Sequence, residues 1–445
     1  MTSAEAPADG PHDGPGGPDG PDAVPRWKVV GPGLVVAATG VGAADLVATL
    51  VAGAKFGYTL LWVAVLGAVI KVVLVEGAGR YSLATQRTIF EGWRSLGRWT
   101  TWYFAPYILV WGLVYGATAM SSTALPVVAL FPDLPLRWTA VAFGLVGLAL
   151  VWFGSYAAFE KITAALVGVM FVTVVGAAVL TLPNLGEVLL GLRPVFPDDS
   201  VVNVLGIAGG VGGTITLAAY GYWLREKGWH TPRFMRVMRI DNGVAYVVTG
   251  IFVVSMLVVG AELLYSAGIA LETGDQALVQ LSDVLADRYG EVFGTVFLVG
   301  FWASSFSSLI GVWSGVSLMF ADFVGNLRDL PSGHPDTRTG GRLFKGYLLW
   351  LTFPPMLLLL LDEPVGLILA YGALGALFMP FLAITLLVLL NKRRPGALPH
   401  SDVPQQWRNG WLSNTGLVVC AVLFLLLGAN ELRGVLAPYV PFLEG

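Results

Sequence analysis

GVGAAD at residues 40–45 and GGVGGT at residues 209–214 are the two stretches that decide the fold. Each places a Gly-Val-Gly inside a long apolar run, where glycine weakens a helix. A helix that breaks inside a membrane frees backbone carbonyls and amides, which protein, water or substrate must satisfy. Paired glycine-interrupted helices in two halves of a chain indicate a transport site near the membrane midplane. Close helix packing is the alternative use of glycine, but it explains such dense clusters less well.

The composition around these stretches is that of a membrane protein. Hydrophobic residues make up 56% of the 445 residues and charged residues only 12%, against about 25% charged in an average soluble domain. Such a chain cannot cover a water-facing surface, which excludes a soluble enzyme. The formal charge of −3 does not support nucleic-acid binding. The single cysteine, Cys420, excludes an internal disulfide, a thiolate zinc site and an iron–sulfur cluster.

Apolar runs long enough to cross a bilayer, which takes about 20 residues each, occur about eleven times along the chain. The runs are continuous rather than alternating, so they predict helices and not a β-barrel. No cluster of nucleophile, base and metal ligands is visible within them, so an enzyme is the least expected class. The predicted spans are residues 29–54, 58–83, 101–123, 138–154, 160–182, 201–223, 240–263, 291–320, 343–361, 364–390 and 411–430.

These spans divide the chain into four parts. Residues 1–25 are rich in Pro, Gly, Asp and Ala, cannot bury apolar surface, and are expected to form a disordered cytoplasmic tail. Residues 26–200 and 201–391 hold five spans each. Because five is an odd number, the second set begins on the opposite side of the membrane from the first, and the two sets have opposite topology. They are therefore predicted to be two inverted five-helix repeats. Residues 392–445 are expected to form a cytoplasmic loop, an eleventh transmembrane helix and a short C-terminal tail.

Lysine and arginine predict the orientation in the membrane. With the N-terminus in the cytoplasm, only five of the 26 basic residues fall outside and Lys71 lies within a span. Basic residues concentrate on the cytoplasmic side of membrane proteins, so this asymmetry predicts a cytoplasmic N-terminus, an external C-terminus and a location in the plasma membrane. The five external residues are Lys55, Arg137, Arg193, Arg288 and Arg433.

Several motifs resemble the Nramp family of divalent metal transporters, and the resemblance extends from about residue 29 to residue 430. It implies an all-α, LeuT-like fold of two inverted five-helix repeats plus an eleventh helix. It also implies a divalent metal as substrate, with no cofactor. The matching motifs are GPG at 31–33, AGAKFGY at 52–58, LLWV at 60–63, ASSFSS at 303–308 and MPF at 379–381.

The chain departs from the family pattern at the metal site. The family breaks its first helix at Asp-Pro-Gly-Asn, whereas residues 42–45 read GAAD here. The family's Met-Pro-His in the sixth helix is matched by residues 216–218, which read TLA, and a glutamine of the tenth helix falls at Gly372. The acidic residues of the family's third helix are missing. The chain therefore resembles the Nramp-related magnesium transporters more than the iron and manganese members, and weak or no proton coupling is expected.

Asp45, Gly42, Gly213 and Thr216 are the predicted metal-binding residues. Asp45 is the only acidic residue of the first span, and an intramembrane charge costs about 3 kcal/mol or more, so we expect it to bind the ion. It could instead cap the second half-helix or form an internal ion pair. The Thr216 hydroxyl and the carbonyls around Gly42 and Gly213 would add hard oxygen ligands, which suit Mg²⁺, Ca²⁺ or Mn²⁺. A lone threonine, however, often bonds its own backbone.

Two further charges within the spans could lie on the transport path. Lys71, near the middle of the second span, is either a fixed positive charge beside the path, paired with Asp45, or a side chain that snorkels to an interface. Glu76 is four residues before Arg80, which predicts an ion pair near the cytoplasmic end, and it is also a candidate for a transport role. Glu262 and Asp322 lie at span ends and are expected to meet water.

Three functions remain open at this point. The first is a secondary transporter of a divalent metal, Mg²⁺ or Mn²⁺, that works by alternating access around the unwound first and sixth helices. The second is a transporter of a small organic cation or amino acid, because Asp45 with nearby aromatic rings would suit an ammonium group. The third is a scaffold or sensor with a degenerate site. The expected partners are the metal ion and the lipid bilayer, with no nucleic acid and no obligate protein partner.

Overall fold

The computed structural model describes residues 31–181, 183–198, 200, 203–204, 207–208, 212–268, 276–360, 364–391 and 403–436. Within these ranges, the side chains of residues 43–45, 277, 364–373, 376, 427 and 430–436 lie outside the description. The predicted tail at 1–25 is also outside it. All regular secondary structure in the described part of the chain is helical, which confirms the all-α prediction.

The first half of the chain forms a broken helix followed by four long helices. The break separates α1 (Pro32–Gly40) from α2 (Ala43–Phe56). The long helices are α3 (Leu61–Thr85), α5 (Arg98–Leu130), α6 (Leu136–Phe153) and α7 (Tyr156–Leu180). The short elements are η3 (Gly57–Leu60), α4 (Ile89–Leu96) and α8 (Leu185–Leu190).

The second half repeats this plan. It contains α10 (Thr216–Glu226), α11 (Met235–Val259) with a π-helical extension η5 (Gly260–Tyr265), α13 (Glu291–Leu327), α14 (Arg342–Leu358) and α15 (Pro364–Asn391). The eleventh span is α16 (Trp411–Leu436). The remaining elements are η4 (Pro232–Phe234), α12 (Gln276–Tyr289), η6 (Pro335–Thr337) and η7 (Gln405–Trp407).

Each predicted span coincides with a helix, although the sixth span is described as a continuous helix only from Thr216 onward. Among the described residues, six helical stretches are long and apolar enough to cross a membrane. They are Leu46–Thr85, Arg98–Leu130, Leu136–Phe153, Tyr156–Leu180, Pro232–Tyr265 and Glu291–Leu327. The apolar stretches of α15 and α16 with described side chains, Leu377–Asn391 and Trp411–Leu426, are shorter.

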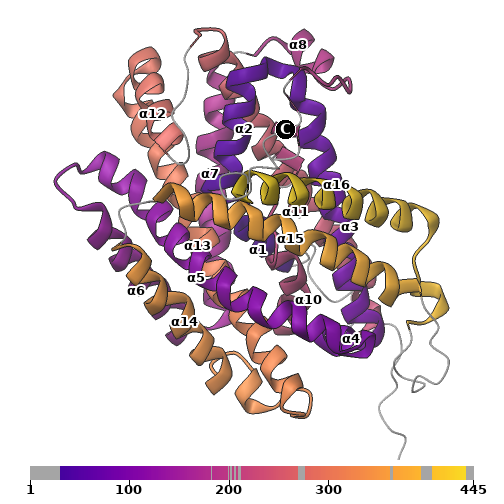
Figure 1. Ribbon diagram of the computed structural model, residues 1–445. Helices are drawn as coiled ribbons and strands as arrows, with labels where there is room; N and C mark the ends of the chain where they lie inside the picture. The colour runs from indigo at the N-terminus through magenta and orange to yellow at the C-terminus, as the bar shows by residue number, and fades with distance from the viewer. Residues whose placement is uncertain are drawn as a thin grey trace, which may run out of the picture.

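α1 lies in the middle of the bundle, packed against α10, α11 and α13 (Figure 1). Corresponding helices of the two halves also pack together: α3 against α11, α5 against α13 and α6 against α14. This is the arrangement expected of two repeats related by symmetry. The broken helices are therefore enclosed by long helices from both halves.

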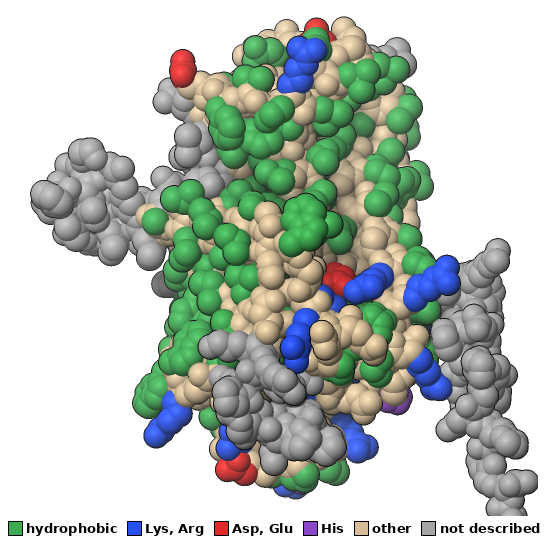
Figure 2. All heavy atoms as spheres, turned by 90° about the vertical axis from the view of Figure 1, so that its right-hand side faces the viewer, with side chains coloured by type: hydrophobic (Ala, Val, Ile, Leu, Met, Phe, Trp, Pro, Cys, Tyr) green, Lys and Arg blue, Asp and Glu red, His purple; other side chains and the backbone are tan. Residues whose placement is uncertain are grey.

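The outer surface is divided along the long axis of the molecule. Figure 2 shows one face on which hydrophobic side chains cover the upper and middle parts, while Lys and Arg gather toward the lower end. The lower end holds α4 and α10 in Figure 1. Large apolar side chains such as Phe153 and Val172 are 84% and 70% exposed. Water would penalise such a surface, whereas lipid tails would solvate it.

The helix α4 was not predicted from the sequence, although its first residues contain a helix-capping motif. Thr88 accepts from the Glu91 amide at 3.3 Å, and Glu91 accepts from the Thr88 amide at 2.9 Å. This capping box follows the Thr-x-x-Glu pattern that precedes many helices. The pattern is visible in the sequence, but the segment is too short to be recognised by hydropathy.

Candidate metal-binding site

The two broken helices touch each other backbone to backbone. α1 ends at Gly40, and the second break precedes α10 with Gly212 at φ +79° and Gly213 at φ +89°. A Cβ atom on Gly40 would lie 2.7 Å from the Gly213 nitrogen, and one on Gly213 would lie 2.8 Å from the Gly40 Cα. The crossing needs glycine on both sides, because no side chain fits and L-residues rarely adopt a positive φ. The predicted break of the first helix is confirmed, because α1 ends at Gly40 and α2 begins at Ala43. At the second predicted break the described backbone is non-helical at Gly213, shortly before α10, whereas residues 209–211 lie outside the description.

Serines of α13 satisfy the backbone carbonyls freed at the first break. Ser304 Oγ donates to the Val41 carbonyl at 2.6 Å, and Ser308 Oγ donates to the Thr39 carbonyl at 2.8 Å. Both serines belong to the ASSFSS motif and are buried. This explains why an apolar helix carries so many hydroxyls, since each unpaired carbonyl inside a membrane costs several kcal/mol.

The second break is held by two different donors. The Tyr246 hydroxyl donates to the Gly212 carbonyl at 3.2 Å, and the Lys71 ammonium donates to the Gly213 carbonyl. Lys71 is wholly buried, and its nitrogen lies 5.4 Å from the centre of the Phe424 ring. Of the two alternatives for Lys71, a side chain that snorkels to an interface is therefore contradicted. Lys71 places a positive charge at the break itself. Its predicted pairing with Asp45 falls outside the description, because the Asp45 side chain is not among the described ones.

A cavity of about 40 Å³ opens where the two breaks meet α5 and α13. A buried water needs about 10–15 Å³ of such space, so the cavity holds about three. Trp111 and Tyr115 of α5 stack at 4.6 Å on one side, and the Tyr115 hydroxyl lies 2.8 Å from Ser308 Oγ. The hydroxyl-bearing lining residues include Thr39, Thr214, Thr216, Ser305, Ser308 and Tyr115.

The lining chemistry is that of hard ligands. The described residues around this cavity include no methionine, cysteine, histidine, aspartate or glutamate. Nor do the described residues contain a cluster of three or more His, Cys, Asp or Glu side chains that could hold a metal elsewhere. The described lining therefore provides only neutral oxygen atoms as ligands for a metal ion. The Asp45 carboxylate is a further candidate ligand, but its side chain lies outside the description.

Three of the four predicted site residues come together at this cavity. Gly42, Gly213 and Thr216 all line it. Thr216 is the first residue of α10 and is 3% exposed. Asp45 follows the first break as the third residue of α2, where a carboxylate is also favoured by the helix dipole.

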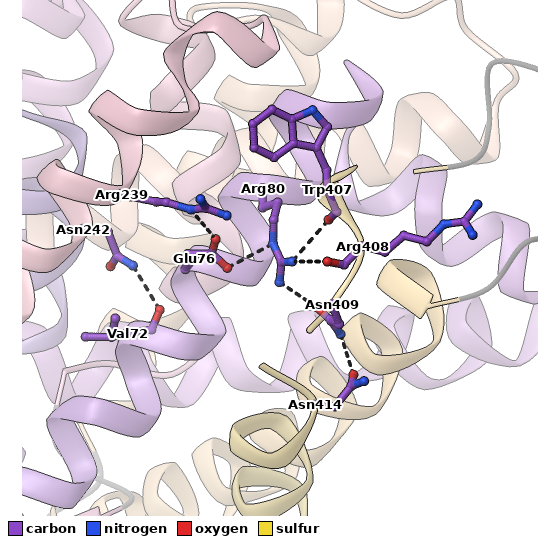
Figure 3. A network of polar contacts seen from close by, with 9 residues as sticks. All are labelled: Val72, Glu76, Arg80, Arg239, Asn242, Trp407, Arg408, Asn409 and Asn414. Carbon is purple, nitrogen blue, oxygen red and sulfur yellow. Dashed lines mark hydrogen bonds and ion pairs between the residues drawn. The ribbon is translucent and has the colours of Figure 1, made fainter. Parts of the chain in front are cut away.

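Glu76 does not line the cavity. Its carboxylate lies 3.1 Å from Arg80 Nε, which confirms the predicted ion pair, and it also accepts from Arg239 at 2.9 Å. Figure 3 shows that Arg80 continues this network to the segment before α16, donating to the Trp407 carbonyl at 3.2 Å. It also donates to the Arg408 carbonyl at 3.1 Å and to Asn409 Oδ1 at 2.6 Å. Glu76 thus belongs to a clamp that ties three parts of the chain together.

Ser305 is a further candidate site residue that the sequence analysis did not name. Its side chain is 3% exposed and lines the cavity, and its hydroxyl has no hydrogen-bond partner among the described residues. A buried hydroxyl without a partner costs about 1–3 kcal/mol, which an ion or water in the cavity would recover. The signal was available, because Ser305 lies in the same motif as the serines that bond the first break.

Asp241 was also missed, and it holds the start of α1. This carboxylate is fully buried and accepts from the Gly31 amide at 2.8 Å, the Gly33 amide at 2.6 Å and the Tyr220 hydroxyl at 2.8 Å. An acidic residue at the edge of the apolar run 240–263 was the available signal. The GPG motif leaves room for it, because a Cβ on Gly33 would lie 2.8 Å from Asp241 Oδ2.

Two other acidic residues do more than meet water. Asp322 accepts from the Tyr222 hydroxyl at 2.7 Å, and Glu262 accepts from the Tyr58 hydroxyl. Both side chains are partly exposed, as expected, but α10 and η3 also bring tyrosines to them that are distant in the sequence. Neither lies at the cavity between the breaks.

Comparison with solved structures gives the same architecture. A manganese transporter from Eremococcus coleocola, in complex with an aromatic bis-isothiourea compound, superposes with a TM-score of 0.74 at 19% identity, covering 93% of this chain and 90% of that one. MhsT in complex with L-phenylalanine superposes with a TM-score of 0.60 at 14% identity, covering 90% of this chain and 98% of that one. The fold is therefore LeuT-like, with two five-helix repeats and an eleventh helix.

Sequence comparison identifies the relatives. The divalent metal cation transporter MntH of Mycobacterium tuberculosis is 26% identical over 306 residues, which are 66% of this chain and 70% of that protein. The MntH protein of Bacillus subtilis is 25% identical over 315 residues, 65% of this chain and 70% of that protein. These relatives are transporters and not enzymes. The model of the family "Natural resistance-associated macrophage protein-like" matches residues 33–432, and the chain therefore belongs to the Nramp family.

Proposed function

We propose that this protein is an integral membrane transporter of a hard divalent cation, Mn²⁺ or Mg²⁺. The observation that carries the proposal is the cavity at the crossing of the two broken helices, whose described lining offers oxygen but no sulfur or imidazole. Mn²⁺ and Mg²⁺ favour carboxylate, carbonyl and hydroxyl oxygens. The relatives named above are divalent metal and manganese transporters, which agrees with this substrate class.

Asp45, Thr216, Ser305 and the carbonyl of Gly42 form the proposed coordination site, although the Gly42 carbonyl also accepts from the Leu46 amide at 3.3 Å. Gly213 shapes the site, but its carbonyl already accepts from Lys71. With room for about three waters, the ion would enter after losing part of its hydration shell. Mg²⁺ dehydrates reluctantly, so the remaining waters and the four oxygen ligands together would complete its coordination.

The size of the cavity argues against an organic cation or amino acid. Pockets for such ligands usually measure about 300–1,000 Å³, several times the 40 Å³ found here. The Trp111–Tyr115 pair would suit an ammonium group, but these rings stack on each other. A metal ion with a few waters fits the space better.

We further propose alternating access around the two breaks, with little or no proton coupling. A proton relay needs titratable side chains along the path. The described residues that line the cavity carry no carboxyl or imidazole group. Glu76 forms ion pairs with Arg80 and Arg239. Acidification inside proteoliposomes during inward metal transport would contradict this part of the proposal.

The experiment is a binding and uptake series on the purified chain. Isothermal titration with Mn²⁺, Mg²⁺, Ca²⁺ and Cd²⁺ is combined with Mn²⁺ uptake into proteoliposomes. Asp45→Ala should abolish both signals, whereas Asp133→Ala, which removes an exposed carboxylate in the loop before α6, should leave them unchanged. Uptake by Asp45→Ala at the unmodified rate would overturn the site.

Metal selectivity provides a second test of the hard-oxygen site. Thr216→Met introduces a thioether, which favours softer ions, so it should raise Cd²⁺ binding relative to Mn²⁺ and Mg²⁺. Thr216→Val, which removes the hydroxyl without adding sulfur, is the matched control and should weaken all ions. If Thr216→Met leaves the Cd²⁺ to Mg²⁺ ratio unchanged, Thr216 does not coordinate the ion.

A further inference from the structure

A second cavity lies near the lower end of the molecule, away from the broken helices. It measures about 420 Å³ and is enclosed by α4, the start of α5 and the end of α13. This volume is in the range of small-molecule sites, about 300–1,000 Å³. None of the residues assigned to the metal site lines it.

The floor of this cavity is made of packed aromatic rings. Phe90 packs against Trp93 and Phe104, each at 4.8 Å between ring centres, and against Phe323 at 5.5 Å. All four side chains are at most 6% exposed and line the cavity. Water in contact with such a floor would find few hydrogen-bond partners, so the inner part favours an apolar group.

The mouth of the cavity is basic. Arg98, the first residue of α5, is exposed and makes no ion pair or hydrogen bond within the described residues. Arg94 is paired with exposed Asp329 at 2.5 Å and donates to the Asn326 carbonyl at 2.6 Å. The Arg94–Asp329 pair is neutral overall, so Arg98 gives the mouth a net positive charge.

Two exposed tryptophans place this mouth at a membrane interface. Trp99 is 50% exposed and Trp102, which also lines the cavity, is 73% exposed. Tryptophan is enriched where lipid headgroups meet the acyl chains. No side chain caps the N-terminus of α5 at this point, so its first amides add to the attraction for an anion beside Arg98.

We propose that this cavity binds an anionic phospholipid, with the phosphate at Arg98 and part of an acyl chain over the aromatic floor. Basic pockets between membrane helices on the cytoplasmic side are known to hold anionic headgroups. The apolar floor requires more than a free phosphate, and the net charge of the mouth favours an anionic over a zwitterionic headgroup. Bound lipid would connect α4 and α5 to the end of α13, the helix whose serines bond the first break.

The test is native mass spectrometry of the full chain after exchange into mixed phosphatidylglycerol and phosphatidylcholine. The unmodified protein should retain phosphatidylglycerol in preference to phosphatidylcholine. A basic residue near a membrane surface contributes about 1 kcal/mol to binding anionic lipid, so Arg98→Gln should lower retention about fivefold. Arg236→Gln is the matched control, because it removes an exposed arginine from α11, which does not border the cavity.

A second variant separates the acyl chain from the phosphate. Ala105→Phe fills the cavity from α5 and keeps both arginines, so it should also lower phosphatidylglycerol retention, with an unchanged melting temperature as evidence of folding. Equal retention by the unmodified protein, Arg98→Gln and Ala105→Phe would overturn the proposal. Displacement of the lipid by inorganic phosphate alone, with no loss in Ala105→Phe, would show a simple anion site and would also overturn it.

Discussion

Gly213 combines two demands that only glycine meets at the crossing of the breaks. Its φ of +89° is strained for any L-residue, and a Cβ would lie 2.8 Å from both the Gly40 Cα and Thr216 Oγ1. Gly213→Ala should therefore abolish Mn²⁺ uptake and lower the melting temperature by several degrees, since such strain costs about 1–3 kcal/mol. Gly176→Ala is the control, because its Cβ would meet nothing within 4 Å. Normal uptake by Gly213→Ala would show that the crossing can open without loss of function.

Lys71 offers a test that separates charge from structure. Lys71→Gln removes the positive charge but can still donate to the Gly213 carbonyl, whereas Lys71→Met removes both. Repulsion between an ammonium group and a nearby divalent ion exceeds 1.4 kcal/mol even in a polarisable interior, so Lys71→Gln should bind Mn²⁺ at least about tenfold more tightly. Lys71→Met should also destabilise the protein. Unchanged Mn²⁺ affinity in Lys71→Gln, measured by titration calorimetry, would make Lys71 purely structural.

The residues that sequence reasoning identified are those whose chemistry is unusual for a membrane span. Gly42, Gly213 and Thr216 were predicted because glycine clusters and a family motif marked the two breaks, and all three line the same cavity. The partner of Lys71 could not be predicted, because a buried ammonium can bond any carbonyl within reach and only the fold selects Gly213. Ser305 was missed because a hydroxyl inside a helix usually bonds its own backbone.

At the scale of elements, a buried carboxylate from α11 holds the start of α1. Asp241 of α11 accepts from the amides of Gly31 and Gly33, and a hydrogen bond to a charged acceptor contributes about 1.5–3 kcal/mol. Asp241→Asn should therefore speed hydrogen exchange at the α1 amides by about 10- to 100-fold. Asp283→Asn, an exposed change on α12, is the control. Equal exchange in both variants would contradict a role for Asp241 in holding α1.

The elements were predicted in proportion to their hydropathy. All long spans were predicted, because a run of about 20 apolar residues is long enough to cross a bilayer as a helix. The helices α4 and α12 were not, since short amphipathic segments resemble loops when only runs of apolar residues are counted. The clamp around Arg80 was half predicted: the spacing of Glu76 and Arg80 indicated their ion pair, but the segment at 407–409 reaches Arg80 only through the fold of the chain.

At the scale of the whole molecule, the orientation can be tested with two matched serines. A cytoplasmic N-terminus places Ser266 outside, after α11, and Ser332 inside, after α13. With Cys420 replaced by Ala, Ser266→Cys should react with an impermeant thiol reagent in intact cells and Ser332→Cys only after lysis. Both serines are exposed, so access is limited by the membrane alone. The opposite labelling pattern would invert the proposed topology.

The ammonium of Lys71 on the Gly213 carbonyl has an electrical consequence. If Asp45 belongs to the proposed site and is ionised while Lys71 is protonated, the charges of the empty site cancel, and a bound divalent ion raises the net charge of the site to +2. Each charge that crosses the full membrane field is worth about 2.3 kcal/mol per 100 mV. The loaded carrier would therefore be pulled inward by the resting voltage, while the empty carrier would return without an electrical penalty. A transporter that lacks a proton relay could in this way concentrate its ion by membrane voltage alone, and Lys71→Gln would make its return step voltage-dependent.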